Sequence, residues 1–242
     1  MSSSKGCKII YEEKPPEINT EDSRPLVIVS CAISLDGKLA SEKGDTRLSS
    51  FEDKVEVHRL RSRIDAILVG INTILADDPH LTVSEKYYKS NRHPIRVVLD
   101  SYCRIPLNAQ VLTRRREVPT IIATTRKAPE DKIRKLREMG ADVIVTDGEK
   151  VNIREVLTYI RRKYGVRKLM VEGGGKVIGE FFKNNLVDLV RVSITPVIFG
   201  GEKSIPLIRG VSFDTIEESP RLKLYRIELC GHNIVLHFYV EK

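Results

Sequence analysis

The stretch KLMVEGGGKVIGE, residues 168–180, decides how the rest of the chain is interpreted. Its apolar run, Leu169 to Val171, is typical of a short buried strand, and three glycines then precede a helical pattern. Glycine permits positive φ and, because it lacks a Cβ, lets a ligand approach the backbone closely. The first turn of a helix also points free N–H groups outward, which suits a phosphate. Since the stretch is neither GxGxxG nor a P-loop, a phosphate site and a simple tight turn both remain open here.

Composition indicates a soluble globular protein. The chain has 242 residues, of which 41% are hydrophobic and 31% charged. No run reaches the roughly 20 apolar residues that span a bilayer. The first residues lack the apolar core of a secretory signal. We therefore expect a cytoplasmic protein with no membrane partner.

Cysteine spacing and charge distribution count against disulfide-rich, metal-binding and nucleic-acid-binding proteins. The cysteines Cys7, Cys31, Cys103 and Cys230 are far apart, so we expect them to be reduced, with neither a disulfide framework nor a metal site. The net charge of +8 suggests nucleic-acid binding as one possible function. However, Lys and Arg are dispersed among acidic residues and are not interleaved with aromatic residues. We expect no nucleic-acid partner; a basic surface also suits a phosphorylated substrate and cofactor.

The order of the elements predicts an α/β fold with a mostly parallel sheet. Residues 1–24 contain Pro15–Pro16 and many charges and are expected to be an N-terminal arm, flexible or laid over a neighbour; residues 25–242 form a single domain. Helices expected near 52–64, 72–78, 133–139 and 153–164 alternate with buried strands at 26–33, 66–69, 95–99, 120–123 and 142–145. This alternation predicts helices on both faces of the sheet. A strand within 186–195, a loop-rich stretch over 196–220 and an antiparallel hairpin over 222–239 complete the domain.

Seven short motifs occur in a fixed order: SLDGK (34–38), GD (44–45), LR (60–61), DAILVG (65–70), TILADDPHLT (73–82), VLD (98–100) and VEGGG (171–175). Together they resemble the pyrimidine reductases of riboflavin biosynthesis, a family similar in fold to dihydrofolate reductase. The resemblance covers residues 25–240 and implies NADPH-dependent reduction of a ribosylaminopyrimidinone 5′-phosphate, usually by a homodimer. No zinc-deaminase signature is present. The chain therefore resembles the stand-alone archaeal and fungal form, which acts on the 2,5-diamino substrate.

The resemblance also assigns site residues. It places Ala32, Thr73, Asp77, Ser101 and the segment Gly174, Gly175, Lys176, Val177 and Ile178 at the NADPH cofactor. It places Thr46, Arg61, Leu81 and Glu172 at the substrate. Leu48 stands where the bacterial pattern has Trp, and Ser84 where it has Arg, so Lys86 or Arg92 are the alternatives for contacting the substrate phosphate.

Residue chemistry adds further candidates and leaves alternatives open. Arg126 and Lys127 follow a strand that ends at Thr124–Thr125, where a guanidinium could meet a 2′-phosphate or simply be solvated. Glu172, Asp77 or a bound water could supply the proton. The reaction alternatives are a reductase of the deaminated pyrimidine, a dihydrofolate reductase, and a nucleotide-binding protein without catalysis. Arg61 and the ordered motifs count against dihydrofolate reductase, whose substrate carries no sugar phosphate.

Overall fold

The structure is a computed structural model that describes residues 6–15, 18 and 23–241. Its helices are α1 (Phe51–Arg61), α2 (Ile71–Asp77), α3 (Gln110–Thr113), α4 (Glu130–Glu138), α5 (Ile153–Tyr164) and α6 (Gly175–Lys183). Strands β3 (Lys38–Ala40) and β10 (Ile205–Pro206) pair in a small sheet. The other strands are β1 (Lys8–Glu12), β2 (Leu26–Ser34), β4 (Ala66–Gly70), β5 (Ile95–Leu99), β6 (Thr120–Thr125), β7 (Asp142–Thr146), β8 (Lys168–Gly173), β9 (Leu189–Thr195), β11 (Leu222–Cys230) and β12 (Asn233–Val240).

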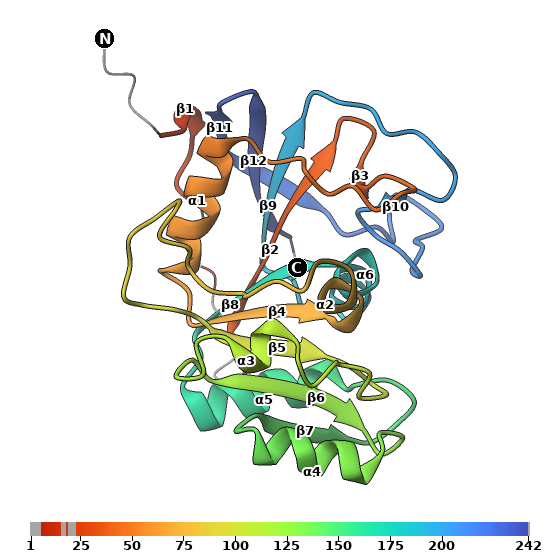
Figure 1. Cartoon of the computed structure of the whole chain (residues 1–242). Coiled ribbons are helices and arrows are strands. Elements are labelled where there is room, and N and C mark those ends of the chain that lie inside the picture. The colour runs from red at the N-terminus through yellow and green to blue at the C-terminus, as the bar shows by residue number, and fades with distance from the viewer. Residues whose placement is uncertain (1–5, 16–17, 19–22, 242) are drawn as a thin grey trace.

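Within these described residues, ten strands form one sheet in the order β1-β11-β12-β9-β2-β8-β4-β5-β6-β7. The run from β9 to β7 is parallel, and β12, β11 and β1 continue it antiparallel beyond β9. Figure 1 shows the twist of this sheet between β7 at the bottom and β1 at the top. The predicted fold class is confirmed, including the C-terminal antiparallel hairpin.

Alternate side chains of the parallel strands enter two apolar clusters, one on each face. On one face α5 and α6 pack on residues such as Val29, Leu68 and Val171. On the other, α2, α3 and α4 pack on residues such as Ile67, Val98 and Met170. Strands buried on both faces read as continuous apolar runs, which is why the sequence located them so well.

Helix α1 differs from its predicted form. It ends at Arg61, before Ile64, and its buried residues are Asp53 and His58 instead of an apolar stripe. Asp53 forms a 2.5 Å ion pair with Arg191 of β9, and both side chains are at least 95% buried. The helix therefore depends on a buried ion pair, which hydrophobic periodicity cannot reveal.

The N-terminal arm contains a strand that was not predicted. Lys8–Glu12 pairs antiparallel with β11, with Lys8 opposite Leu229. This pairing brings Cys7 to Cys230, and the two form a disulfide with their Cα atoms 4.3 Å apart. The expectation that all cysteines are reduced is therefore wrong for this pair. A separation of 223 residues left no local sequence signal.

We expect the disulfide to stabilise the fold, because it closes almost the whole chain into one loop and so restricts the unfolded state. Cys7→Ser should lower the free energy of unfolding by about 2–5 kcal/mol. Denaturant unfolding with and without reductant measures the effect, and reductant should not change the variant further. Equal stability of the oxidised and reduced wild-type protein would contradict the prediction.

Candidate functional site

The residues expected at the cofactor gather at one edge of the sheet. Parallel strands place their carboxyl ends together, and ligands of open α/β sheets bind outside those ends. Ala32 lies in the second half of β2, Thr73 in α2 directly after β4, Ser101 just after β5 and Gly174 just after β8. The structure thus brings these separate motifs to a common edge.

The glycine turn between β8 and α6 is open toward this edge. Gly173 has φ +122°, a conformation that side chains disfavour, and its peptide bond to Gly174 is cis. Gly174 is the N-cap of α6 and no side chain caps the helix. A Cβ built on Gly174 would meet only Thr73 Oγ1, at 3.8 Å. The start of α6 at Gly174 therefore has open space beside it.

The glycines at 175 and 179 have a different, structural reason. They lie one turn apart on α6, where residues 206–211 cross the helix. A Cβ on Gly175 would lie 2.6 Å from the Pro206 carbonyl oxygen, and one on Gly179 would lie 3.0 Å from that of Arg209. The Arg209 amide also donates to the Gly175 carbonyl at 3.1 Å. We call residues 206–211 the strap.

Arg61 and Glu172, expected at the substrate, are in direct contact. Arg61 donates from Nε and Nη2 to the two carboxylate oxygens of Glu172, at 2.8 and 2.5 Å, and from Nη1 to the Thr82 carbonyl at 3.0 Å. The two side chains are only 15% and 14% exposed. Bidentate pairing at a protected position fixes the guanidinium. The pair lies where the end of α1 meets the end of β8.

The two candidate proton donors differ in their surroundings. Both oxygens of Glu172 accept hydrogen bonds from Arg61. Among the described residues Asp77, at the end of α2, has no such partner, and desolvation raises the pKa of its carboxyl group above the usual value. Its neighbour Asp78 is the left-handed C-cap of α2 and accepts from the Gln110 amide at 2.8 Å, so Asp78 is structural.

Several expected site residues have buried side chains. Leu81 (φ +52°), Thr124 and Ile178 are at most 2% exposed, so only their backbone could meet a ligand. By contrast, Thr46 and Lys176 are exposed, and Val177 packs beside Gly70. Arg126 and Lys127 are exposed and ion-paired with Asp147 and Glu149 respectively. The carboxylates would have to release these cations for them to bind a phosphate.

The segment after α2 is ordered against α1. The Ser84 amide donates to Nδ1 of His58 at 3.0 Å, and Tyr87 stacks on the His58 ring at 4.9 Å between centroids. Of the alternatives for the substrate phosphate, Arg92 is paired with Asp65 at 2.5 Å, and Lys86 lies over the Tyr87 ring. Sequence reasoning missed His58 because a histidine among arginines on a helix looks solvated.

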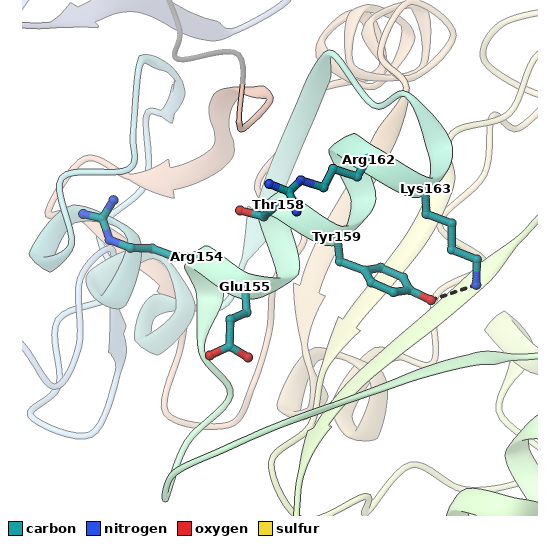
Figure 2. Close-up of a pocket in the computed structure, with 6 residues that line it drawn as sticks. All are labelled: Arg154, Glu155, Thr158, Tyr159, Arg162 and Lys163. Carbon is teal, nitrogen blue, oxygen red and sulfur yellow. Dashed lines mark hydrogen bonds between the residues drawn. The ribbon is translucent and has the colours of Figure 1, made fainter.

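A shallow depression on the outer side of α5 contains none of the expected site residues. It is lined by Arg154, Glu155, Thr158, Tyr159, Arg162 and Lys163 (Figure 2). Tyr159 and Lys163 both donate to Asp142 of β7, at 2.8 and 2.9 Å. This hydrogen-bonded group fastens α5 to the edge strand.

Across the described ranges no helix is long and apolar enough to cross a bilayer. The same residues contain no cluster of three or more His, Cys, Asp or Glu side chains suited to a metal ion.

Comparison with known proteins agrees with this geometry. The 2,5-diamino-6-ribosylamino-4(3H)-pyrimidinone 5′-phosphate reductase of Archaeoglobus fulgidus is 45% identical over 198 residues, covering 78% of this chain and 89% of that protein. The enzyme of the same name from Methanothermobacter thermautotrophicus is 38% identical and covers 90% of this chain and 99% of its own.

A solved structure shares the fold. RibD from Acinetobacter baumannii superposes with a TM-score of 0.77 at 22% identity, over 90% of this chain and 58% of that one. The sequence model of the RibD C-terminal domain matches residues 25–236. This match spans both the glycine turn and the Arg61–Glu172 pair, and the chain therefore belongs to the RibD C-terminal domain family.

Proposed function

We propose that this protein catalyses the NADPH-dependent reduction of 2,5-diamino-6-ribosylamino-4(3H)-pyrimidinone 5′-phosphate to its ribitylamino product. The observation that carries the proposal is the convergence of the open glycine turn and the Arg61–Glu172 pair at one sheet edge, in a chain whose relatives are named as this reductase. It is accordingly an oxidoreductase of riboflavin biosynthesis.

The residues at the sheet edge fit a nicotinamide dinucleotide. The uncapped first turn of α6 with Gly174 and Thr73 beside it suits a pyrophosphate, and Ala32 offers a small side chain on β2 for the nicotinamide end. Arg126 and Lys127, at the end of β6, are the cations for a 2′-phosphate. Bound NADPH would supply the hydride, while the protein supplies binding and orientation.

The chain's own residues then have distinct roles. Glu172 and the Thr82 carbonyl hold the Arg61 guanidinium, so that it can orient the substrate without losing much conformational entropy. Asp77 is our candidate for delivering the proton, directly or through a water. A dihydrofolate reductase activity is disfavoured, since the relatives of this chain are named as the pyrimidinone phosphate reductase.

We further propose a cytoplasmic homodimer. Leu229 of β11 and Ile234 of β12 lie directly opposite each other at the antiparallel end of the sheet, and both side chains are exposed. Contiguous apolar side chains on a protein surface are typical of an interface.

NADPH oxidation by the purified protein tests the reaction. We expect turnover with the 2,5-diamino substrate, much slower turnover with the deaminated 5-amino-uracil analogue and none with dihydrofolate. Preference for the deaminated compound would establish the alternative reductase, and turnover of dihydrofolate would overturn the assignment.

The Arg126→Ala/Lys127→Ala double variant should raise the KM for NADPH far more than that for NADH, because only NADPH carries the 2′-phosphate. Initial-rate kinetics with both cofactors measure the difference. The Asp147→Asn variant is the matched control and should leave NADPH binding intact or stronger, since it removes a competing carboxylate. Equal effects on both cofactors would remove these cations from the 2′-phosphate site.

Gly174→Ala should weaken NADPH binding without unfolding the protein, because the added Cβ meets no protein atom closer than 3.8 Å. Gly175→Ala should instead lower the melting temperature, since its Cβ would lie 2.6 Å from the strap. Fluorescence titration with NADPH and thermal unfolding separate the two effects. Unchanged cofactor affinity in Gly174→Ala would make the turn purely structural.

Arg61→Ala should lower kcat/KM by about 10-fold or more, the loss of a charge-assisted hydrogen bond of about 1.5–3 kcal/mol. Arg61→Lys keeps the positive charge but cannot make two parallel hydrogen bonds as a guanidinium does, so it should recover only part of the activity. NADPH affinity should barely change. Arg59→Ala, which removes a partly exposed side chain paired with Glu56 on another flank of the same helix, is the control and should be near neutral. The same loss in Arg59→Ala would show that the substrate site is misplaced.

A further inference from the structure

We propose that Lys54 on α1, together with Nε2–H of His58, binds the 5′-phosphate of the substrate. The inference rests on the proposed function for the identity of the substrate and deepens it by assigning its phosphate. The site lies between α1 and the segment that begins at Ser84, next to the Arg61–Glu172 pair.

Helical spacing places these side chains together. Residues 54, 58 and 61 are separated by four and three positions, so they share one face of α1. Asp53 is directed to the sheet, where it pairs with Arg191, and Glu56 pairs with Arg59 on another flank. The face with Lys54 is therefore the one that also presents Arg61 to Glu172.

His58 is held so that one ring nitrogen is available as a donor. Nδ1 accepts the Ser84 amide, so the proton of the neutral ring is on Nε2. Burial, followed by the nearby charges of Arg61 and Lys54, lowers the pKa of His58 to about 3, which keeps the ring neutral. Stacking on Tyr87 fixes its plane. No group in the described part of the chain accepts a hydrogen bond from Nε2.

Lys54 differs from the other cations near His58 because its side chain has no acidic partner among the described residues. Its side chain is half-buried and, among the described residues, forms no ion pair or hydrogen bond. The neighbouring cations are engaged, Arg61 by Glu172 and Arg92 by Asp65. A bound phosphate would supply the anionic partner that Lys54 lacks among the described residues.

The dimensions agree with the substrate. Lys54 and Arg61 are seven residues apart, roughly 10 Å along the helix axis. A ribosylaminopyrimidine phosphate can bridge that span, with its sugar near Arg61 and its phosphate beside Lys54 and His58. The phosphate would then be far from the α6 turn assigned to the cofactor.

The test compares a phosphorylated ligand with its dephosphorylated counterpart. NADPH oxidation is measured with the 2,5-diamino substrate and with its nucleoside form, for wild type, Lys54→Gln, Lys54→Arg and the control Arg59→Gln. Binding of ribose 5-phosphate and of ribose is measured by calorimetry on the same proteins. We expect Lys54→Gln to lower kcat/KM for the phosphorylated substrate by about 10-fold or more and to leave the nucleoside unaffected, with partial recovery in Lys54→Arg.

The two measurements separate this inference from the proposed function. If wild type turns over neither pyrimidine but binds ribose 5-phosphate through Lys54, the function fails and the phosphate site stands. If Lys54→Gln reduces both substrates equally, or binds ribose 5-phosphate as wild type does, the site is overturned. Absence of any ribose 5-phosphate binding by wild type also overturns it.

Discussion

The position of β8 in the sheet is the constraint on which the site depends. This strand hydrogen-bonds to β2 on one side and β4 on the other, and its residues Leu169, Met170 and Val171 are fully buried. Everything that follows Val171 is consequently fixed in space. Glu172 emerges beside α1, where it meets Arg61, and Gly173 and Gly174 emerge beside α2. One buried strand thus sets the distance between the Arg61–Glu172 pair and the glycine turn.

Polar contacts then anchor the loops around that edge. Asp36 accepts hydrogen bonds from the Ser34 hydroxyl and from the Phe199 and Gly200 amides, which together hold the pKa of its carboxyl group at about 2. The Leu207 amide donates to the Gly37 carbonyl at 3.1 Å, and the strap continues from there across α6.

A second group of contacts lies beneath the loop that contains Thr46. The Asn233 side chain donates to the Leu48 carbonyl and to the Ser193 and Thr195 hydroxyls, at 2.9 to 3.1 Å. Buried networks whose members are all satisfied rigidify a structure. The loops that contain Asp36 and Thr46 are therefore fastened to the sheet.

Sequence reasoning predicted what depends on local pattern and missed what depends on distant pairing. The apolar strands and the glycine turn were predicted because their signals lie within a few residues. The small sheet of β3 and β10, the Asp53–Arg191 ion pair and the Cys7–Cys230 disulfide each join segments far apart in the chain. Glycine itself was ambiguous: only the structure separates the open Gly174 from Gly175, which accommodates the strap.

The disulfide also determines how the molecule responds to mechanical force. Cys7 and Cys230 lie close to the two chain ends, and β12 follows Cys230. A load applied between the termini passes from Cys7 to Cys230 through a covalent bond and bypasses the parallel sheet. Among the described strands only β12 lies outside the covalently closed loop, so an oxidised molecule pulled from its ends loses that strand first and keeps its parallel strands assembled.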